Sequence, residues 1–488
     1  MSELPLGWAE TTLGELADWG SGGTPSRSDP NYYGGTIPWI KSGELNSRYV
    51  TTTEEFITEA AIKNSSAKLF PAGSVAIAMY GATIGKTAIL GVDASTNQAC
   101  AVGAPVKEII GKELLYRLLQ NEKEAFIEKG KGGAQPNISQ AVIKAHEVNL
   151  PPLAEQSRIV EKLDELLAQV DSLKARIDAI PALLKRFRQS VLTAAVSGKL
   201  TEEWRGSVAY LGSAHELHQQ LKFSHEAEGG HARGNASNPT EEAHDLNADD
   251  LPDCWDIAEM RDICAPGRPI TYGILKPGPE LEEGVPYIRV ADFPGNKLSM
   301  LNIKKTSPEI DLQFKRARLI AGDLLLSIRG SVGRLITIPK ALQGANITQD
   351  TARLSISPLV SAAFIYWTLL ADSTQLRMKN ATRGVAVRGI NIGDVRAIQI
   401  PLPAIEEQTE IVRRVEQLFA FADQLEAKVA SAKTRIDLLT QSILAKAFRG
   451  ELVPQDPNDE PASVLLERIK AQRAAAPKAK RARKGAQA

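Results

Sequence analysis

The stretch LPPLAEQSRIVEKLDELLAQVDSLKARIDAIPALLKRFRQSVLTAAVSGKL, residues 150–200, decides the fold because it occurs twice in the chain. A shift of 252 residues superimposes it on residues 402–452 without an insertion, so that Glu155 aligns with Glu407 and Gly198 with Gly450. In both copies apolar residues recur at alternating spacings of three and four, which is the pattern of a coiled-coil seam. The seam residues are Ile159, Leu163, Leu166, Val170, Leu173, Ile177, Ile180, Leu184, Phe187 and Val191, then Ile411, Val415, Leu418, Ala422, Leu425, Val429, Ala432, Ile436, Leu439 and Ile443.

A shared register over so many turns predicts that the two helices pack against each other, because neither could bury its seam alone. Each large seam residue that becomes buried contributes about 1.5 to 3 kcal/mol. Two independent core helices are the alternative. Pro181 lies inside the first copy and aligns with Lys433. Because an internal proline removes a helix hydrogen bond, we expect a bend or an interruption near Ile180.

The regions before the two long helices repeat as well. Residues 37–45 match residues 285–293, pairing Lys41 with Arg289, and residues 72–81 match residues 321–330, pairing Tyr80 with Arg329. Residues 131–138 match residues 383–390. Apolar runs that end at a glycine, such as VAIAMYG and LLLSIRG, predict buried strands. The chain is therefore one module of about 200 residues used twice, each copy a strand-rich region followed by a long helix.

These matches divide the chain into six segments. Residues 1–149 and 251–400 are strand-rich, residues 150–205 and 401–452 are helical, residues 206–250 form a polar linker, and residues 453–488 end in a basic tail. The linker should hold a short helix around Leu217. It also contains His215 and His218, but no third ligand stands at metal-binding spacing, so a solvated linker is favoured over a metal site.

Composition limits the classes of function. Lysine plus arginine equals aspartate plus glutamate at 58 each, so an argument for nucleic-acid binding must be local. Cys100, Cys254 and Cys264 have no metal-ligand spacing and cannot all pair, which indicates buried thiols in a reducing compartment. The sequence shows no signal peptide and no membrane-spanning run, so we expect a cytoplasmic protein.

Motifs for catalysis are missing from the sequence. The string YGATIGKT at residues 80–87 approaches a phosphate-binding loop, but the first glycine of that motif would have to occupy the position of Tyr80. The sequence has no GxSxG, HExxH or CxxC motif, and no NPPY-like string of the kind found in adenine methyltransferases. No catalytic residue and no metal ligand are therefore predicted.

Basic and amide residues at glycine-rich turns remain, and they are doubled between the copies. The loop at residues 129–137 corresponds to the loop at residues 379–391. Glycine lets the backbone approach a phosphate, lysine and arginine neutralise its charge, and arginine and glutamine can pair with base edges. An ordinary surface turn is the alternative for any one residue. The candidate DNA contacts are Lys41, Tyr80, Lys86, Lys131, Gln135, Arg289, Arg329, Arg334, Arg383 and Arg388.

The two helical copies resemble the conserved helical regions of the DNA specificity subunit of type I restriction-modification systems, most of all those of the type IA subgroup. The resemblance is carried by LPPLAEQSRIVEKLDELLAQVDSLKAR and IPALLKRFRQSVLTAAVSGKLTEEWR, and by EEQTEIVRRVEQLFAFADQLEAK and LTQSILAKAFRGEL. The strings IPWIKSGEL and MYGATIGKTAI are similar to segments of the target-recognition domains of that family. The resemblance covers nearly the whole chain except the linker.

This resemblance implies a noncatalytic subunit that reads a bipartite, asymmetric site in double-stranded DNA. It implies two methyltransferase subunits, which bind S-adenosylmethionine and methylate adenine, and two restriction subunits, which use ATP and magnesium. No cofactor is implied on this chain. The rival hypotheses are a self-sufficient adenine methyltransferase and a coiled-coil scaffold without DNA specificity.

The expected fold is α+β, with two strand-rich target-recognition domains separated by two long antiparallel coiled-coil helices in an internal pseudo-twofold repeat. A helix of about 45 residues is roughly 65 to 70 Å long. Antiparallel pairing would put the target-recognition domains at opposite ends, where each could address its own major-groove half-site. Exposed helix faces, such as residues 183–189 and 443–450, are the expected docking surfaces for partner subunits.

Overall fold

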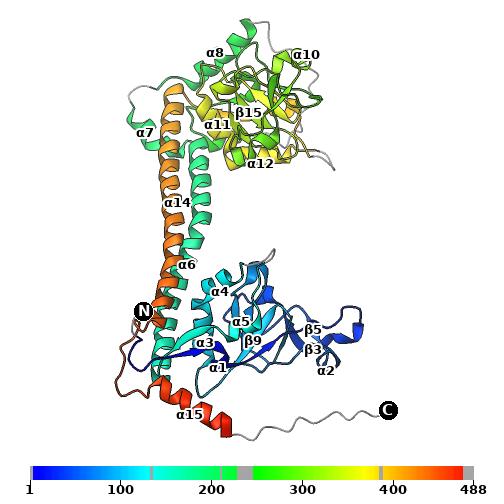
Figure 1. Cartoon of the computed structure of the whole chain (residues 1–488). Coiled ribbons are helices and arrows are strands. Elements are labelled where there is room, and N and C mark those ends of the chain that lie inside the picture. Colours follow the sequence, from blue (N-terminus) through cyan, green and yellow to red (C-terminus); the bar gives the residue numbers. More distant parts are fainter. Residues whose placement is uncertain (1–3, 132–135, 209–210, 228–245, 384–387, 476–488) are drawn as a thin grey trace. The chain divides into compact units, whose positions relative to one another are not determined.

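The computed structural model describes residues 4–131, 136–208, 211–227, 246–383 and 388–475, and it confirms the expected α+β class (Figure 1). The chain forms two compact units, each assembled from separate pieces of the sequence. The first unit comprises residues 1–178 and 430–488, and the second comprises residues 179–429. Two helices of 44 residues, α6 (Leu153–Val196) and α14 (Ile405–Phe448), each contribute one part to each unit.

The two long helices pair antiparallel within each unit. From Lys174 to Asp178 the position in α6 rises by four residues, and the ionic partner in α14 falls by four, from Asp437 to Lys433. From Asp178 to Arg188 the position rises by ten, and the partner falls by ten, to Asp423. The ion pairs that show this are Lys174–Asp437 (3.2 Å) and Asp178–Lys433 (2.6 Å) in the first unit, and Arg188–Asp423 (2.7 Å) in the second. The predicted pairing is confirmed, and the alternative of two independent helices is excluded.

The predicted seam lines the packed faces of both helices. Leu173 and Leu439 are its exceptions, at 47% and 45% exposed. Each part of the pair also enters the hydrophobic core of its own unit. The buried seam residues are Ile159, Leu163, Val170, Leu184 and Val191 in α6, and Ile411, Val415, Ala422, Val429, Ile436 and Ile443 in α14.

Helix α6 continues through Pro181 as a single helix, so the predicted interruption is wrong, whereas a bend stays a prediction. Proline has no N–H to donate to the carbonyl of Ile177. Pro181 itself is exposed. An internal proline costs roughly 3 kcal/mol. Packing of Ile177 and Leu184, one on either side of the proline, offsets that cost.

Two sheets and one strand pair build the strand-rich region of the first unit. The five-stranded sheet has the order β2-β9-β6-β7-β4, the three-stranded sheet has the order β5-β3-β8, and β1 pairs with β10. The strands are β1 (Ala9–Thr12), β2 (Ala17–Ser21), β3 (Tyr33–Ile40), β4 (Tyr49–Val50), β5 (Phe56–Ile57), β6 (Val75–Ala78), β7 (Thr87–Leu90), β8 (Ser95–Thr96), β9 (Cys100–Pro105) and β10 (Glu147–Leu150).

The second unit repeats this topology, and its described residues contain no counterpart of β4. Its sheets have the orders β12-β18-β15-β16 and β14-β13-β17, and β11 pairs with β19. The strands predicted from VAIAMYG and LLLSIRG are β6 and β15, which are fully buried. The strands are β11 (Asp256–Glu259), β12 (Thr271–Tyr272), β13 (Val285–Ile288), β14 (Lys304–Thr306), β15 (Leu324–Ser327), β16 (Leu335–Thr337), β17 (Asn346–Ile347), β18 (Thr351–Leu354) and β19 (Gln399–Leu402).

Short helices complete both regions, with α3 packed on β6 and β7 and α11 packed on β16. The first region contains α1 (Leu13–Leu16), α2 (Glu59–Asn64), α3 (Lys112–Asn121), α4 (Lys123–Lys129) and α5 (Gln140–Lys144). The second contains α9 (Met260–Ile263), α10 (Pro308–Gln313), α11 (Ala362–Leu370), α12 (Asp372–Asn380) and α13 (Ile392–Arg396).

The repeat extends into the segments that were expected to be a linker and a tail. After α7 (Glu202–Ser207), the linker forms α8 (Ala214–Ala227), which confirms and lengthens the short helix predicted there. The tail forms α15 (Ala462–Ala475), a helix of the same length. Both bury the same helical face, through Ala214, Leu217, His218 and Leu221 in α8 and through Ala462, Leu465, Leu466 and Ile469 in α15.

This packing determines the burial of His218 and of the three cysteines. His218 is buried and contacts Asp256 (Nδ1 to Oδ2, 3.0 Å), so this part of the linker is not solvated. Cys100 and Cys264 are buried free thiols whose pKa values are raised to about 12 by burial, whereas Cys254 is exposed, contrary to expectation. Within the described ranges, no helix is long and apolar enough to cross a membrane.

Candidate nucleic-acid interface

Each strand-rich region contains the same junction between a strand-end turn and a glycine-rich loop. In the first unit the turn after β6 binds residues 136–138, and in the second the turn after β15 binds residues 388–390. The four backbone hydrogen bonds are equivalent in the repeat. They run from the N–H of Gly81 to the carbonyl of Pro136 (2.9 Å), from Ile138 to Met79 (2.9 Å), from Gly330 to Arg388 (3.0 Å) and from Ile390 to Ile328 (2.9 Å).

The two junctions bring together the segments that carry several of the predicted residues. Tyr80 meets the loop that carries Lys131, and Arg329 meets the loop that carries Arg383 and Arg388. All five side chains are exposed, Tyr80 at 43%. The sequence pairing of turn and loop thus corresponds to real proximity in both units.

Charge is neutralised to different extents in the two junctions. Lys131 forms an ion pair with Glu128 (2.5 Å), whereas Arg329 donates to an uncharged glutamine side chain (3.1 Å). Arg383 and Arg388 form no ion pair with any residue that the structure describes. The second junction therefore presents free positive charge, and the first presents an aromatic ring and a paired lysine.

Lys86 and Arg334 occupy equivalent positions beyond tight turns. Each follows a glycine with a positive φ, Gly85 (77°) and Gly333 (92°). Both side chains are half-buried, and Lys86 Nζ donates to Asn46 Oδ1 (2.8 Å). Neither forms an ion pair within the described part of the chain, so both keep their charge at the edge of the junction. Gln135, which was also predicted, lies outside the described residues.

Lys41 and Arg289 also occupy equivalent turns, but carboxylates neutralise both. Glu44 accepts a hydrogen bond from the backbone N–H of Lys41 (2.7 Å), and Asp292 accepts one from that of Arg289 (2.8 Å). The Lys41 side chain pairs with Glu55 (2.8 Å), and the Arg289 side chain pairs with Asp292 (2.6 Å). These contacts give both cations a structural role, and their predicted role in DNA binding stays a prediction.

A groove of about 560 Å³ in the first unit is lined by the strand-rich region and the long helices. Lys86 lines it together with three residues that the sequence analysis missed. Asp164 of α6 accepts hydrogen bonds from Arg48 (Nη1 to Oδ2, 2.9 Å) and from Arg117 (Nη2 to Oδ1, 2.8 Å). This double ion pair ties the strand-rich region to α6. Arg48 directly precedes β4, which has no counterpart among the described residues of the second unit, so the repeat in the sequence does not mark it.

Replacing Asp164 with asparagine is expected to destabilise the first unit by about 1 to 2 kcal/mol at pH 7, because it leaves two arginines without their counterion. Burial raises the pKa of Asp164, but the hydrogen bonds from Arg117 and Arg48 outweigh it and the pKa is lowered. The contribution is therefore present above the ordinary value of 3.8 and lost as the pH falls through the folded-state pKa. Urea unfolding of Asp164→Asn at pH 7 measures it.

The neighbouring residue offers a matched control. Glu165 is exposed and pairs with Lys162 alone (2.7 Å) among the described residues, so Glu165→Gln should change stability by less than about 0.5 kcal/mol. Equal effects of the two substitutions would contradict a specific role for Asp164.

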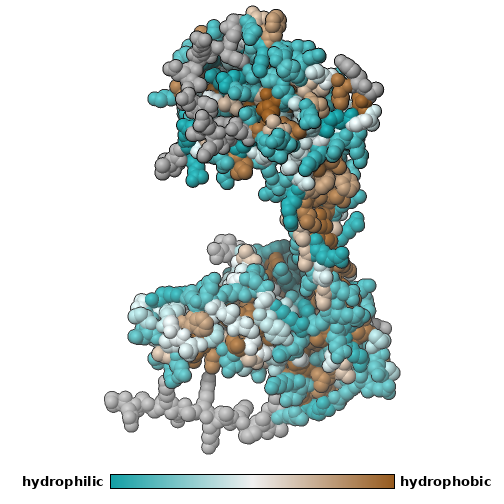
Figure 2. Space-filling model, turned by 180° about the vertical axis from the view of Figure 1, so that it is seen from behind, coloured by the Kyte–Doolittle hydropathy of each residue, from teal (hydrophilic) through white to brown (hydrophobic). Residues whose placement is uncertain are grey.

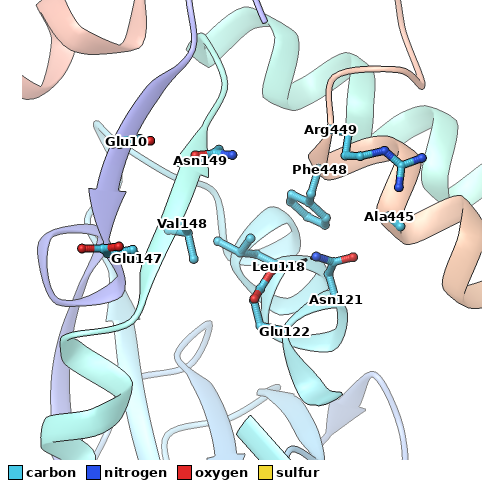
Figure 3. A pocket seen from close by; sticks show the side chains of 10 residues that line it. All are labelled: Glu10, Leu118, Asn121, Glu122, Glu147, Val148, Asn149, Ala445, Phe448 and Arg449. Carbon is cyan, nitrogen blue, oxygen red and sulfur yellow. Dashed lines mark hydrogen bonds between the residues drawn. The ribbon is translucent and has the colours of Figure 1, made fainter. Parts of the chain in front are cut away.

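A second cavity of the first unit, about 310 Å³, is not part of the interface. Glu10, Glu122 and Glu147 line it, as Figure 3 shows. Its one lining cation, Arg449, is paired with Glu451 (2.8 Å). A surface with this charge repels DNA phosphates. In the described part of the chain, no group of three or more His, Cys, Asp or Glu side chains is placed to hold a metal ion.

Comparisons with known proteins agree with the duplicated architecture. Residues 5–182 and 252–432 match the family described as type I restriction modification DNA specificity domain. The chain is 37% identical to the EcoBI specificity subunit of Escherichia coli, over 76% of this chain and 74% of that protein. It is 32% identical to the EcoKI specificity subunit of Escherichia coli strain K12, over 99% of both chains.

Solved structures share the fold. A structure from work on complex assembly and conformational transition of the type I R-M system has a TM-score of 0.60 at 19% identity, covering 92% of this chain and all of the other. The HsdS subunit from Thermoanaerobacter tengcongensis has a TM-score of 0.54 at 20% identity, covering 92% of this chain and 98% of the other. At these identities the similarity concerns the fold alone.

Proposed function

The chain belongs to the family of DNA specificity subunits of type I restriction-modification systems, and from this membership we propose how its two halves divide a DNA target. A subunit of this family selects the DNA sequence and is not itself the catalyst. We propose that the target-recognition domains, residues 1–149 and 251–400, each read one half of a bipartite, asymmetric site. The long helices then set the distance between the halves and dock the methyltransferase subunits.

One observation carries this proposal: the two junctions share a backbone but differ in side chains. Tyr80 stands where Arg329 stands in the repeat, and Lys131 stands where Arg383 stands. A common scaffold that presents different donors and aromatic surfaces suits two different half-sites. The proposed DNA contacts are Lys41, Tyr80, Lys86, Lys131, Gln135, Arg289, Arg329, Arg334, Arg383 and Arg388.

The paired helices support the role of a spacer. Their ion pairs are antiparallel in both units, and seam residues such as Leu163 and Val415 are buried in the cores of their units. Each helix continues for 44 residues, and α6 does so in spite of Pro181. A spacer of this kind would fix the number of base pairs between half-sites.

Partner subunits are expected on the exposed faces of these helices. Figure 2 shows hydrophobic residues gathered on the long helices. Leu183 is 54% exposed and Phe421 is 55% exposed, so both are accessible to a partner. The segment 443–450 offers less than the sequence suggested, because Leu444, Ala447 and Phe448 are buried in the core of the first unit.

The identity and number of the partner subunits, and the cofactors that they bind, are assigned from membership of the family. We propose two methyltransferase subunits that bring S-adenosylmethionine, and two restriction subunits that bring ATP and magnesium. The chain itself would hold none of these cofactors. A cytoplasmic location, where DNA and these partners meet, fits its three free cysteines.

The test is sequence-selective protection of DNA. The full chain, combined with its methyltransferase subunits, should protect two short blocks of one duplex against cleavage. Scrambling either block should abolish selective protection, whereas scrambling the bases between the blocks at constant length should leave it intact. Equal binding to the target and to random duplex would overturn the proposal. The chain alone should transfer no methyl group from S-adenosylmethionine to DNA.

A further inference from the structure

Charge is distributed unequally between the two target-recognition domains, although the whole chain is neutral. Residues 251–400 carry 19 lysines and arginines against 14 aspartates and glutamates, a net charge of +5. Residues 1–149 carry 13 against 16, a net charge of −3. Two domains of one fold, presented to the same polyanion, therefore experience forces of opposite sign at long range.

Part of this imbalance lies at the junction. In the second unit, Arg329, Arg383 and Arg388 are brought together by backbone bonds, since the N–H of Gly330 donates to Arg388 (3.0 Å) and the N–H of Arg383 donates to Gly389 (2.9 Å). All three side chains are exposed, and none forms an ion pair with a described residue.

The equivalent positions of the first unit carry little free charge. Tyr80 replaces the first arginine, Lys131 replaces the second but pairs with Glu128, and Pro136 replaces the third. The first domain has two other predicted cations, Lys41 and Lys86. Lys41 forms an ion pair with a carboxylate. At these three equivalent positions, the second domain thus has three free cations and the first has one paired cation.

A cluster of exposed, unpaired arginines on a glycine-rich turn matches the chemistry of DNA phosphates. Each phosphate that is neutralised releases a condensed counterion, which makes binding depend on salt. Guanidinium groups bind phosphate oxygens in pairs of hydrogen bonds. An aromatic ring and a proline contact bases and sugars without releasing ions, so their contribution varies little with salt.

We infer that the two target-recognition domains bind DNA by different means, which rests on the proposed function. The second domain binds the phosphate backbone through Arg329, Arg383 and Arg388. It supplies most of the salt-sensitive affinity for DNA. The first domain adds affinity and selectivity through uncharged contacts centred on Tyr80. The second domain is accordingly the one that holds nonspecific DNA while a target is sought.

The test compares charge removal at equivalent positions, in the full chain combined with its methyltransferase subunits. The triple variant Arg329→Gln, Arg383→Gln, Arg388→Gln should bind both target and random duplex more weakly. Its slope of log affinity against log salt should be less steep by about 2.7, since each lost phosphate contact removes about 0.9. Between about 50 and 200 mM salt, the wild type should therefore lose roughly 40-fold more affinity than the variant. Fluorescence anisotropy with labelled duplexes measures both.

Two further variants keep the result interpretable. The matched double variant Tyr80→Gln, Lys131→Gln should weaken binding to the target but change the salt slope by no more than about 0.9. The charge-preserving triple variant Arg329→Lys, Arg383→Lys, Arg388→Lys should keep the wild-type slope. Because all of these side chains are exposed, thermal unfolding should be unchanged.

Three outcomes would overturn this inference. The glutamine triple could keep the wild-type slope, or the first-domain double could lower the slope as much as the triple does. The lysine triple could keep nonspecific affinity but lose preference for the target, which would show that the arginines read bases. Failure of the wild-type complex to prefer any sequence would instead overturn the proposed function, and the two failures are distinguishable.

Discussion

Exchanging residues 256–402 for the corresponding region of a relative is expected to change one half of the DNA target and leave the other half unaltered. The region leaves and rejoins the chain at neighbouring points, because β11 pairs antiparallel with β19. Trp255 donates to Glu407 just outside the exchanged region (2.9 Å), so this contact stays with the host. The new domain can therefore fold on its own strand pair. The effect is large, since recognition of the old half-site should be lost.

Methylome mapping of a host that expresses the chimera with its methyltransferase subunits reads the whole target at once. The reciprocal exchange of residues 9–150, bounded by the pair β1–β10, is the control and should change the other half. A target that stays the same in both chimeras would show that the chain is a scaffold without specificity. A change in both halves after one exchange would contradict the division of labour between the domains.

Lengthening both long helices by one heptad is expected to lengthen the spacer of the DNA target by about three base pairs. Seven residues add about 10.5 Å of helix, and each base pair adds about 3.4 Å. In the observed register, a break after Ile180 lies opposite a break after Ala430, because Asp178 pairs with Lys433. Duplicating residues 174–180 and 424–430 at these points keeps the three-four spacing of both seams.

The register supplies the control for this experiment. A heptad inserted after Ala430 alone would shift α14 against α6 and break the ion pairs on one side of the insertion, including Lys174–Asp437. That variant should lose stability instead of gaining a defined longer spacer. Binding to a series of duplexes that differ only in spacer length distinguishes the two. An unchanged spacer preference in the matched insertion would show that the helices do not set the spacer length. It would leave the DNA-reading role intact.

The long helices and the repeat could be predicted because their signals are local. Seam residues such as Leu163 and Val415 are buried as their spacing indicates, and the matched segments fold into the same strand order in both units. Pro181 misled the prediction of an interruption, because the propensity of one residue was outweighed by the packing of the seam around it. A short helix around Leu217 was predicted, but its equivalence with α15 was not, because the two sequences share buried positions and few identities.

The sequence by itself determined the helical period, the duplicated modules and the short set of turns that could meet DNA, since each of these is encoded by spacing along the chain. Only the tertiary structure decided which cations are free. In the sequence, Lys41 and Arg329 are both basic residues at turns. In the structure, Lys41 forms an ion pair with a carboxylate, whereas Arg329 forms none with any described carboxylate. Asp164 lies 47 residues from Arg117, so their ion pair depends on how the domain packs on α6. Electrostatic energy depends on distance in space, and sequence spacing does not contain it.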